Sequence, residues 1–198
     1  MEIFEKAKII KNAFDSYLIL PIEEWIPLAE LMDLRTVKKE VTIKTSGKVE
    51  NNFNLIISGS LCILHWNTNN FICTDLFFED EFAFDHLSFI THQSTPYEVR
   101  AMEDTILLTG TYSGLKKFLN QTKYSENIQH FGIQFLYVDK HYKQFQLLTK
   151  TPTQRYLTML KQQGKMLLRV PHKYIASYIG ITQQSLSRIR RKVSHPPH

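Results

Sequence analysis

The chain has 198 residues, of which 43% are hydrophobic and 12% aromatic, so a packed core is expected and a disordered chain is excluded. We find no charged-then-apolar leader and no run of about 18 apolar residues, and we therefore expect a cytoplasmic protein with no membrane contact. The net charge of +5 is unevenly spread: residues 1–139 carry a net −7, whereas residues 140–198 carry 12 Lys and Arg and no acid. An acid-free basic segment is typical of a surface that binds a polyanion, and it places a boundary near residues 140–150.

The sequence offers no recognisable metal or cofactor site. Cys62 and Cys73 lie on apolar segments and are interpreted as buried, reduced thiols, because a Cys-ligated metal needs about four ligands and none lie nearby. His86 and His92 lie six residues apart in an acidic stretch, with Asp85 adjacent, but isolated histidines more often form hydrogen bonds than bind metal. We predict no cofactor.

The N-terminal two thirds predict a helix followed by a barrel. Residues 16–34 have helical spacing of apolar residues, with Pro21 near the start. From residue 36 to 111, short β-branched and aromatic runs alternate with turn residues such as Ser58-Gly59-Ser60, which favours a small antiparallel barrel or jelly roll. The predicted strands are 41–43, 53–57, 61–64, 71–78, 97–101 and 106–108. A short helix over 112–120 closes the barrel.

Residues 124–149 predict one long helix with an apolar seam. Its apolar residues are separated alternately by four and three positions for over three heptads, the spacing that lets two helices pack along one another. A helix lying on its own barrel remains an alternative, but a two-fold homodimer explains the seam better. The predicted dimer interface comprises Ile128, Phe131, Phe135, Val138, Tyr142 and Phe145.

The last region predicts two short helices joined by a tight turn. Pro171 suits the first helical position, Gly180 can adopt positive φ and end the helix, and Thr182 can cap a second helix over 183–192. The positions that would face inward are apolar or small, as two steeply crossing helices require. These residues are Ile175, Ala176, Ile179, Ile181, Leu186 and Ile189.

The outward face of the second helix carries side chains that can read DNA. Glutamine can bond bidentately to adenine and arginine to guanine in the major groove, whereas other basic residues contact phosphates. The predicted base contacts are Gln183, Gln184, Ser187 and Arg188. The predicted phosphate contacts are Lys173, Thr182, Arg190, Arg191 and Lys192.

The segment KYIASYIGITQQSLSRIRRK (173–192) resembles the helix-turn-helix of the Crp/Fnr family of transcription regulators (cyclic-AMP receptor protein and fumarate-nitrate reduction regulator). Gln184 to Arg188 is similar to the family's pattern Glu-x-x-Ser-Arg, and NLIISGSL (54–61) to its strand-turn pattern. The order of predicted elements agrees over nearly the whole chain. The resemblance implies an α+β protein with a cyclic-nucleotide-binding-like barrel over 1–122, a dimerisation helix over 123–149 and a helix-turn-helix domain over 150–198.

Two departures limit what the resemblance implies. Gln184 stands where the family has glutamate, and because glutamine both donates and accepts, we predict a preference for adenine at that base step. In residues 81–96, Phe82-Ala83 or a neighbouring pair replaces the Gly-Glu pair that holds the phosphate of cyclic AMP. Thr95-Pro96 stands where Arg-Ser would complete the clamp, so we predict no tight binding of cyclic AMP.

The sequence therefore predicts a homodimeric regulator that binds palindromic double-stranded DNA, with RNA polymerase as a further partner and an effector that the sequence does not identify. An alternative is a ligand-binding barrel whose basic helical tail binds a protein. An enzyme is disfavoured because the three barrel histidines, His65, His86 and His92, have no ligand spacing and no nucleophile–base pair is recognisable.

Overall fold

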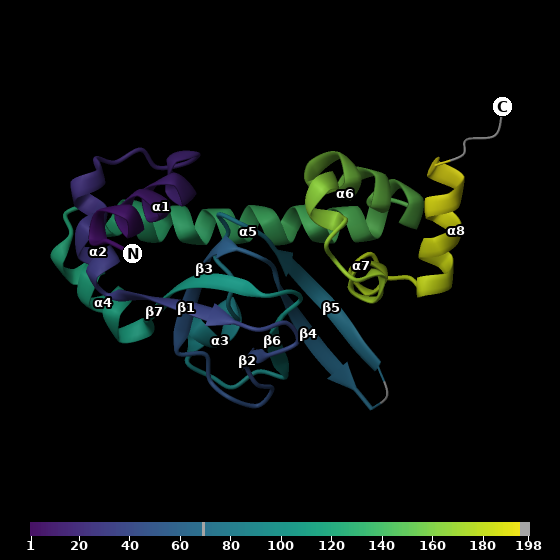
Figure 1. Ribbon diagram of the computed structural model, residues 1–198, viewed down its shortest axis with the longest axis horizontal. Helices are drawn as coiled ribbons and strands as arrows, with labels where there is room; N and C mark the ends of the chain where they lie inside the picture. Colours follow the sequence, from purple (N-terminus) through teal and green to yellow (C-terminus); the bar gives the residue numbers. More distant parts are fainter. Residues whose placement is uncertain (69, 195–198) are drawn as a thin grey trace.

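The computed structural model describes residues 1–68 and 70–194, and its elements form three groups along the chain (Figure 1). The N-terminal helices are α1 (Ile3–Asp15), the 3-10 helix η1 (Ile22–Trp25) and α2 (Ile26–Glu30). The strands are β1 (Met32–Val37), β2 (Thr42–Lys44), β3 (Asn52–Ser58), β4 (Leu61–Asn67), β5 (Asn70–Phe77), β6 (Tyr97–Ala101) and β7 (Thr105–Thr111), with α3 (His86–Thr91) inserted before β6. The remaining helices are α4 (Tyr112–Gln121), α5 (Ser125–Thr149), α6 (Pro152–Leu167), α7 (His172–Tyr178) and α8 (Gln183–Ser194). None of these helices combines the length and hydropathy that crossing a lipid bilayer requires.

The strands form two antiparallel sheets with a shared core. One sheet has the order β1-β7-β3 and the other the order β2-β6-β4-β5. In the first sheet Leu108 of β7 lies opposite Leu34 on one side and Leu55 on the other. The predicted antiparallel barrel or jelly roll is therefore confirmed, and all six predicted strands are present. The core between the sheets consists of Val37, Ile56, Leu61, Ile63, Phe77, Ala83, Val99, Ala101 and Leu107.

The turn between β3 and β4 requires glycine at position 59. Gly59 has φ +104°, and a Cβ there would lie 2.5 Å from Oγ1 of Thr105 and 2.8 Å from the carbonyl oxygen of Asp104. A larger residue would therefore need both a strained backbone and a displaced β7.

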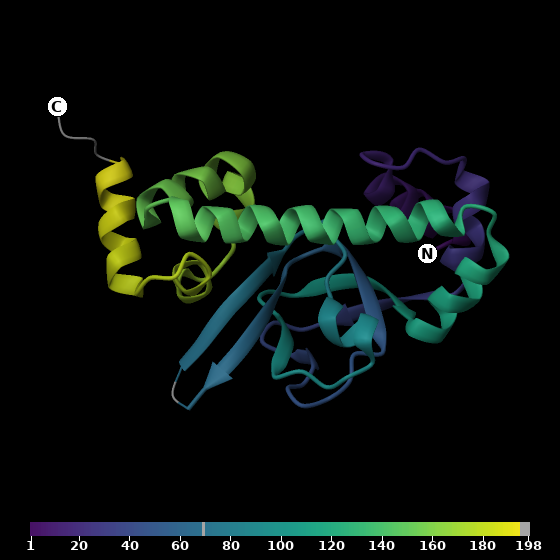
Figure 2. The same cartoon turned by 180° about the vertical axis from the view of Figure 1, so that it is seen from behind.

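The long helix α5 connects the two ends of the molecule. Figures 1 and 2 show, from opposite sides, that it runs past the barrel with α1 and α2 near its start and α6 to α8 near its end. Two further cores lie at these ends. One packs the N-terminal helices on the first sheet and includes Trp25, Met32, Phe118 and Ile128. The other joins β4 and β5 to α6, α7 and α8 and includes Cys62, Cys73, Met159, Tyr174 and Leu186.

The N-terminal prediction was wrong in part. Only residues 22–30 of the predicted helix 16–34 are helical, because Met32 to Val37 pair with β7 as strand β1. Helix α1 was not predicted; its buried Ala7 and Ile10 form one apolar stripe, which is a weak signal in a short helix. The predicted helix over 112–120 is confirmed as α4, and both cysteines are free and buried as expected.

Candidate nucleic-acid interface

Helices α7 and α8 are joined by a tight turn at Gly180, as the sequence predicts. The backbone N–H of Gly180 donates to the carbonyl of Ser177 at 3.0 Å, and that of Ile181 donates to the carbonyl of Ala176 at 2.9 Å. These two bonds form a Schellman motif, which ends α7 through a left-handed residue, here Gly180 with φ +72°. Oγ1 of Thr182 accepts the N–H of Ser185 at 3.2 Å and so caps α8.

The inward and outward faces of α8 are as predicted. Leu186 is fully buried. Ile175 and Ala176 of α7, and its C-cap Ile179, are each no more than 2% exposed. Ile181 and Ile189 are partly buried against the same core. The opposite face leaves exposed the side chains of Gln183, Gln184, Ser187 and Arg188.

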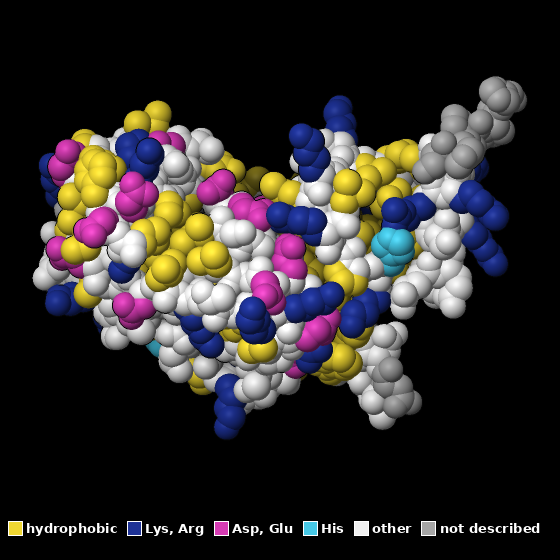
Figure 3. All heavy atoms as spheres, in the orientation of Figure 1, with side chains coloured by type: hydrophobic (Ala, Val, Ile, Leu, Met, Phe, Trp, Pro, Cys, Tyr) yellow, Lys and Arg dark blue, Asp and Glu magenta, His cyan; other side chains and the backbone are white. Residues whose placement is uncertain are grey.

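Within the part of the chain that the structure describes, the cations of α8 have no acidic partner. Among residues 1–68 and 70–194, no carboxylate lies within 4.0 Å of Arg188, Arg190, Arg191 or Lys192. Figure 3 shows this end of the molecule with Lys and Arg on its surface, whereas Asp and Glu lie over the barrel and the N-terminal helices. Arg191 and Lys192 are exposed, and Arg190 is partly buried.

The predicted phosphate contact Lys173 is engaged with the barrel. Its Nζ lies 3.8 Å from Oε1 of Glu40 and 4.7 Å from the ring centroid of Tyr174. A phosphate at this position would have to compete with the Glu40 carboxylate. Thr182 likewise uses its hydroxyl within α8, donating to Oγ of Ser185 at 3.0 Å.

Helix α6 was not predicted, although its start carries a recognisable signal. Oγ1 of Thr151 accepts the N–H of Gln154 at 3.3 Å, and Oε1 of Gln154 accepts the N–H of Thr151 at 2.9 Å. With Pro152 at the first helical position, this is a capping box. The pattern Thr-Pro-x-Gln before an apolar run could have identified α6 from the sequence.

Helix α7 is docked on the free edge of β5. Oγ of Ser177 accepts the backbone N–H of Cys73 at 2.8 Å and donates to the carbonyl of Phe71 at 3.1 Å. Because β5 is the last strand of its sheet, these two backbone groups have no strand partner on that side. The ring of Tyr174 packs on that of Phe71, with centroids 5.3 Å apart. The Ser177 hydroxyl therefore makes two hydrogen bonds that a neighbouring strand would otherwise make at this edge.

Carboxylates of the barrel reinforce this contact. Oε2 of Glu40, in the β1–β2 turn, accepts the phenolic hydroxyl of Tyr174 at 3.2 Å. Nη2 of Arg169, in the loop before α7, donates to Oε2 of Glu79 at 2.7 Å, and its Nε lies 3.4 Å from Oε1 of Glu103. The helix-turn-helix therefore meets the barrel through apolar and ionic contacts together.

One face of α5 packs on its own chain and involves two of the predicted interface residues. Ile128 is buried in the N-terminal core, and Phe131 packs on Tyr17 with ring centroids 4.8 Å apart and on Phe14 at 5.7 Å. Both side chains therefore have partners within their own chain, and those of Phe131 lie in the N-terminal region.

The rest of the predicted seam is exposed. Phe135 is 43% exposed, Val138 63%, Tyr142 42% and Phe145 52%. Their spacing of three, four and three residues places them on one side of α5, and Tyr17 covers only the edge of Phe135. A continuous apolar row of this kind on a surface helix is typical of an interaction face.

A buried ion pair involves Asp85, within the stretch 81–96 that corresponds in sequence to the family's phosphate clamp. Oδ1 of Asp85 accepts the N–H of Ser88 at 3.1 Å and caps α3. Its Oδ2 accepts Nζ of Lys44 at 2.8 Å and also contacts the hydroxyl of Thr95. The Lys44 and Asp85 side chains are only 3% and 2% exposed. Lys44 lies outside residues 81–96, and the pairing of β2 with β6 brings it to Asp85.

A cavity of about 430 Å³ lies between the barrel, α3 and α5. Oδ1 of Asp75 accepts Nζ of Lys140 at 2.6 Å and of Lys143 at 2.9 Å across it. Burial would raise the pKa of the Asp75 carboxyl, but the two ammonium groups outweigh burial and hold its pKa below the ordinary value. Burial lowers the pKa of His86, which also lines the cavity, to about 4, so His86 is neutral at pH near 7.

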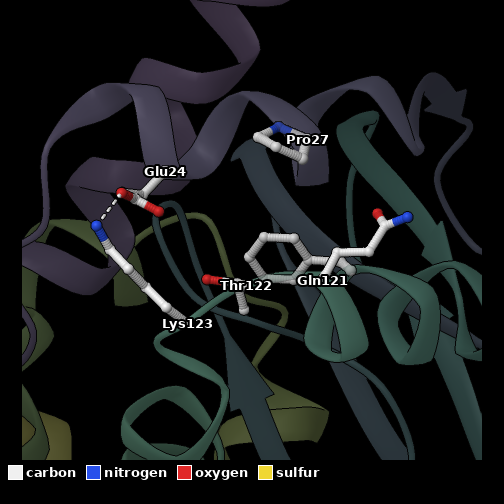
Figure 4. A pocket seen from close by; sticks show the side chains of 6 residues that line it. Glu24, Pro27, Gln121, Thr122 and Lys123 are labelled. Atoms are coloured by element: carbon white, nitrogen blue, oxygen red, sulfur yellow. Dashed lines mark ion pairs between the residues drawn. The ribbon is translucent and has the colours of Figure 1, made fainter.

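A second cavity, of about 250 Å³, lies between α2 and the end of α4. Figure 4 shows its lining, with Nζ of Lys123 3.4 Å from Oε1 of Glu24.

His86 and His92 do not combine with other ligands: in the part of the chain that the structure describes, no group of three His, Cys, Asp or Glu could hold a metal ion.

The fold, in which a cyclic-nucleotide-binding-like barrel is followed by a long helix and by short helices joined by a tight turn, is similar to that of solved Crp/Fnr regulators. The chain is similar to CLP, a c-di-GMP-responsive global regulator in Xanthomonas campestris, with 18% identity, TM-score 0.66, and 90% of this chain and 96% of that chain covered. It is similar to FixK2 from Bradyrhizobium japonicum, with 14% identity, TM-score 0.70, and 82% and 84% covered.

A third solved structure, described as a transcriptional regulator of the Crp/Fnr family from Eubacterium rectale, has 17% identity and TM-score 0.67, with 92% of this chain and 88% of that chain covered. No protein-family model and no curated protein matches the chain. The resemblance drawn from the sequence is therefore confirmed at the level of the fold.

Proposed function

We propose that the chain is a homodimeric transcription regulator that binds palindromic double-stranded DNA through α8. The observation that carries this proposal is the exposed face of α8, where Gln183, Gln184, Ser187 and Arg188 stand beside cations with no acidic partner among the described residues. Glutamine and arginine are the side chains that read adenine and guanine in the major groove. Arg190, Arg191 and Lys192 would contact the flanking phosphates.

The exposed part of α5 supports the homodimer. Two copies that pack through Phe135, Val138, Tyr142 and Phe145 would remove this apolar row from water and place two α8 helices on one duplex, roughly 34 Å apart. Ile128 and Phe131 are left out of the proposed interface because their own chain covers them. RNA polymerase is the expected partner at a promoter.

We further propose that cyclic AMP is not the effector of this regulator. Asp85 accepts a hydrogen bond from the Lys44 ammonium and caps α3. A phosphate bound here would therefore lie against a carboxylate, whereas it needs a cation. Titration calorimetry with cyclic AMP should show no micromolar binding, and micromolar affinity would contradict this part of the proposal.

Selection from a randomised duplex library tests the proposed function. The wild-type chain should enrich a two-fold palindrome, and Arg188→Ala should lose that enrichment, since a bidentate arginine–guanine contact contributes about 1–3 kcal/mol. Lys161→Ala is the matched control, because Lys161 is an exposed cation of α6 that is not among the predicted DNA contacts. It should enrich the same palindrome as the wild type.

The alternative, a barrel whose helical tail binds a protein, predicts a different result. Binding through phosphates weakens steeply as salt rises, because counterions are released from the duplex. Absence of both enrichment and salt-dependent retention of DNA would contradict the proposed function and favour a protein partner.

A further inference from the structure

Arg155, in the first turn of α6, is the side chain that joins the end of α5 to the helix-turn-helix. Its Nη1 donates to the carbonyl of Lys150 at 2.6 Å and to that of Leu147 at 3.4 Å. Its Nε and Nη2 donate to the carbonyl of Ile179 at 3.1 and 2.7 Å. Lys150 is the C-cap of α5 and Ile179 is the C-cap of α7, so one guanidinium contacts the ends of two helices.

These contacts suit the chemistry of helix ends. The last carbonyls of a helix have no partner within it and carry the negative end of the helix dipole. A guanidinium has five N–H donors in a rigid fork, whereas an ammonium has three donors on one nitrogen and cannot span both ends in the same geometry. The carbonyl of Ile179 also directly precedes Gly180, the pivot between α7 and α8.

We propose that Arg155 is a positioning residue that sets the orientation of the helix-turn-helix relative to α5, and through it the separation of the two α8 helices on DNA. The part of this inference that concerns DNA rests on the proposed function. The barrel holds α7 through Tyr174 and Ser177, and Arg155 restrains its other end, next to the turn that leads into α8.

A distance measurement tests the orientation without DNA. Spin labels are placed at Tyr137→Cys on the exposed side of α5 and at Gln183→Cys at the start of α8, since Cys62 and Cys73 are buried. Labelled chains are diluted with unlabelled ones so that each pair lies in one chain. The parent chain should give one narrow distance distribution by pulsed electron paramagnetic resonance. Adding Arg155→Lys or Arg155→Met should broaden it.

The matched control is Lys161→Met, which removes one cation from an exposed position on the same helix. It should leave the distribution narrow. Distributions for both Arg155 variants as narrow as that of Lys161→Met, with the same mean, would overturn the proposal. If Arg155→Met does not fold, Arg155→Lys decides. Loss of the fold in both would also overturn it, because Arg155 would then serve stability and not orientation.

A second measurement uses palindromes whose half-sites are moved apart in steps of one base pair. The wild type should show one sharp optimum. Both Arg155 variants should bind about tenfold more weakly at that optimum and lose the preference among spacings, as expected when a charge-assisted contact is lost. Lys161→Met should keep the affinity and the spacing optimum of the wild type. If the chain binds no DNA, the proposed function fails, and the distance measurement still decides the role of Arg155.

Discussion

Asp75 and Asp85, two buried carboxylates of the barrel, are paired with lysines, whereas Arg188, Arg191 and Lys192 on α8 are exposed and have no acidic partner among the described residues. Lys44 meets Asp85, and Lys140 and Lys143 meet Asp75, each carboxylate being at most 4% exposed. In contrast, Arg188 and Arg191 face solvent on the outward side of α8. A buried charge must be matched inside the molecule, whereas an exposed unmatched cation is available to a partner. The comparison therefore gives the first group a structural role and supports the proposed role of the second group in recognition.

The largest effect is expected for Asp85→Ala. This change leaves the buried Lys44 ammonium without its carboxylate and α3 without its cap. Breaking a buried pair from one side costs about 3–5 kcal/mol of unfolding free energy. Urea unfolding measures the loss. The control is Asp104→Ala, which breaks the exposed pair with Lys38 and should change stability little. Equal losses for the two variants would show that Asp85 is not held as described.

One charged substitution in the proposed dimer interface should be enough to dissociate the dimer. Val138→Glu should raise the dissociation constant of the dimer by at least about hundredfold, because two carboxylates would be buried without partners. Ile133→Glu is matched to it, since both parent side chains are 63% exposed and Ile133 lies on the other side of α5. Sedimentation equilibrium should find the control dimeric. A dimeric Val138→Glu chain would place the interface elsewhere.

The burial of His86 predicts that the stability of the protein depends on pH. His86 has a folded pKa of about 4, below its ordinary value of 6.5, because it is buried. As pH falls below 6.5 the unfolded chain binds this proton first, so stability falls and the contribution is fully lost near pH 4. From about pH 7 to pH 5 this loss is about 2 kcal/mol.

His86→Gln removes this titration, so its unfolding free energy should fall less steeply with acid than that of the wild type. Urea unfolding at several pH values gives both slopes. Parallel curves for the two proteins would mean that His86 titrates alike in the folded and unfolded chains.

The smallest effect is expected at the contact between α7 and β5. Ser177→Ala leaves the N–H of Cys73 and the carbonyl of Phe71 without their partner and should cost about 1 kcal/mol. Amide exchange at Cys73 should become faster. Ser187→Ala, on the exposed face of α8, is the control and should change neither quantity. Unchanged exchange at Cys73 in Ser177→Ala would mean that α7 does not seal this edge.

The sequence was most informative where local chemistry determines structure. Pro171, Gly180 and Thr182 each have a specific backbone role, so the helix-turn-helix could be placed to within two residues. The alternation of β-branched and polar residues likewise located six of the seven strands.

Features that depend on residues far apart in the chain could not be predicted in the same way. Met32 to Val37 form a strand only because β7 offers a partner, which overrides their local helical spacing. Lys44 and Asp85 are 41 residues apart, and the fold alone brings them together. The seam of α5 was visible, but its division between Phe131, covered by Tyr17, and the exposed Val138 depends on where α1 ends.

The most direct test of DNA reading by α8 is a comparison of the sites selected by the wild type and by Gln184→Glu. Glutamine can pair with adenine, whereas glutamate can only accept, as from the amino group of cytosine. We predict adenine at one step of each half-site for the wild type and cytosine at the same step for Gln184→Glu, with the rest of the palindrome unchanged. Identical sites for the two proteins, or no enriched site for either, would contradict the assignment of α8 as the reading helix.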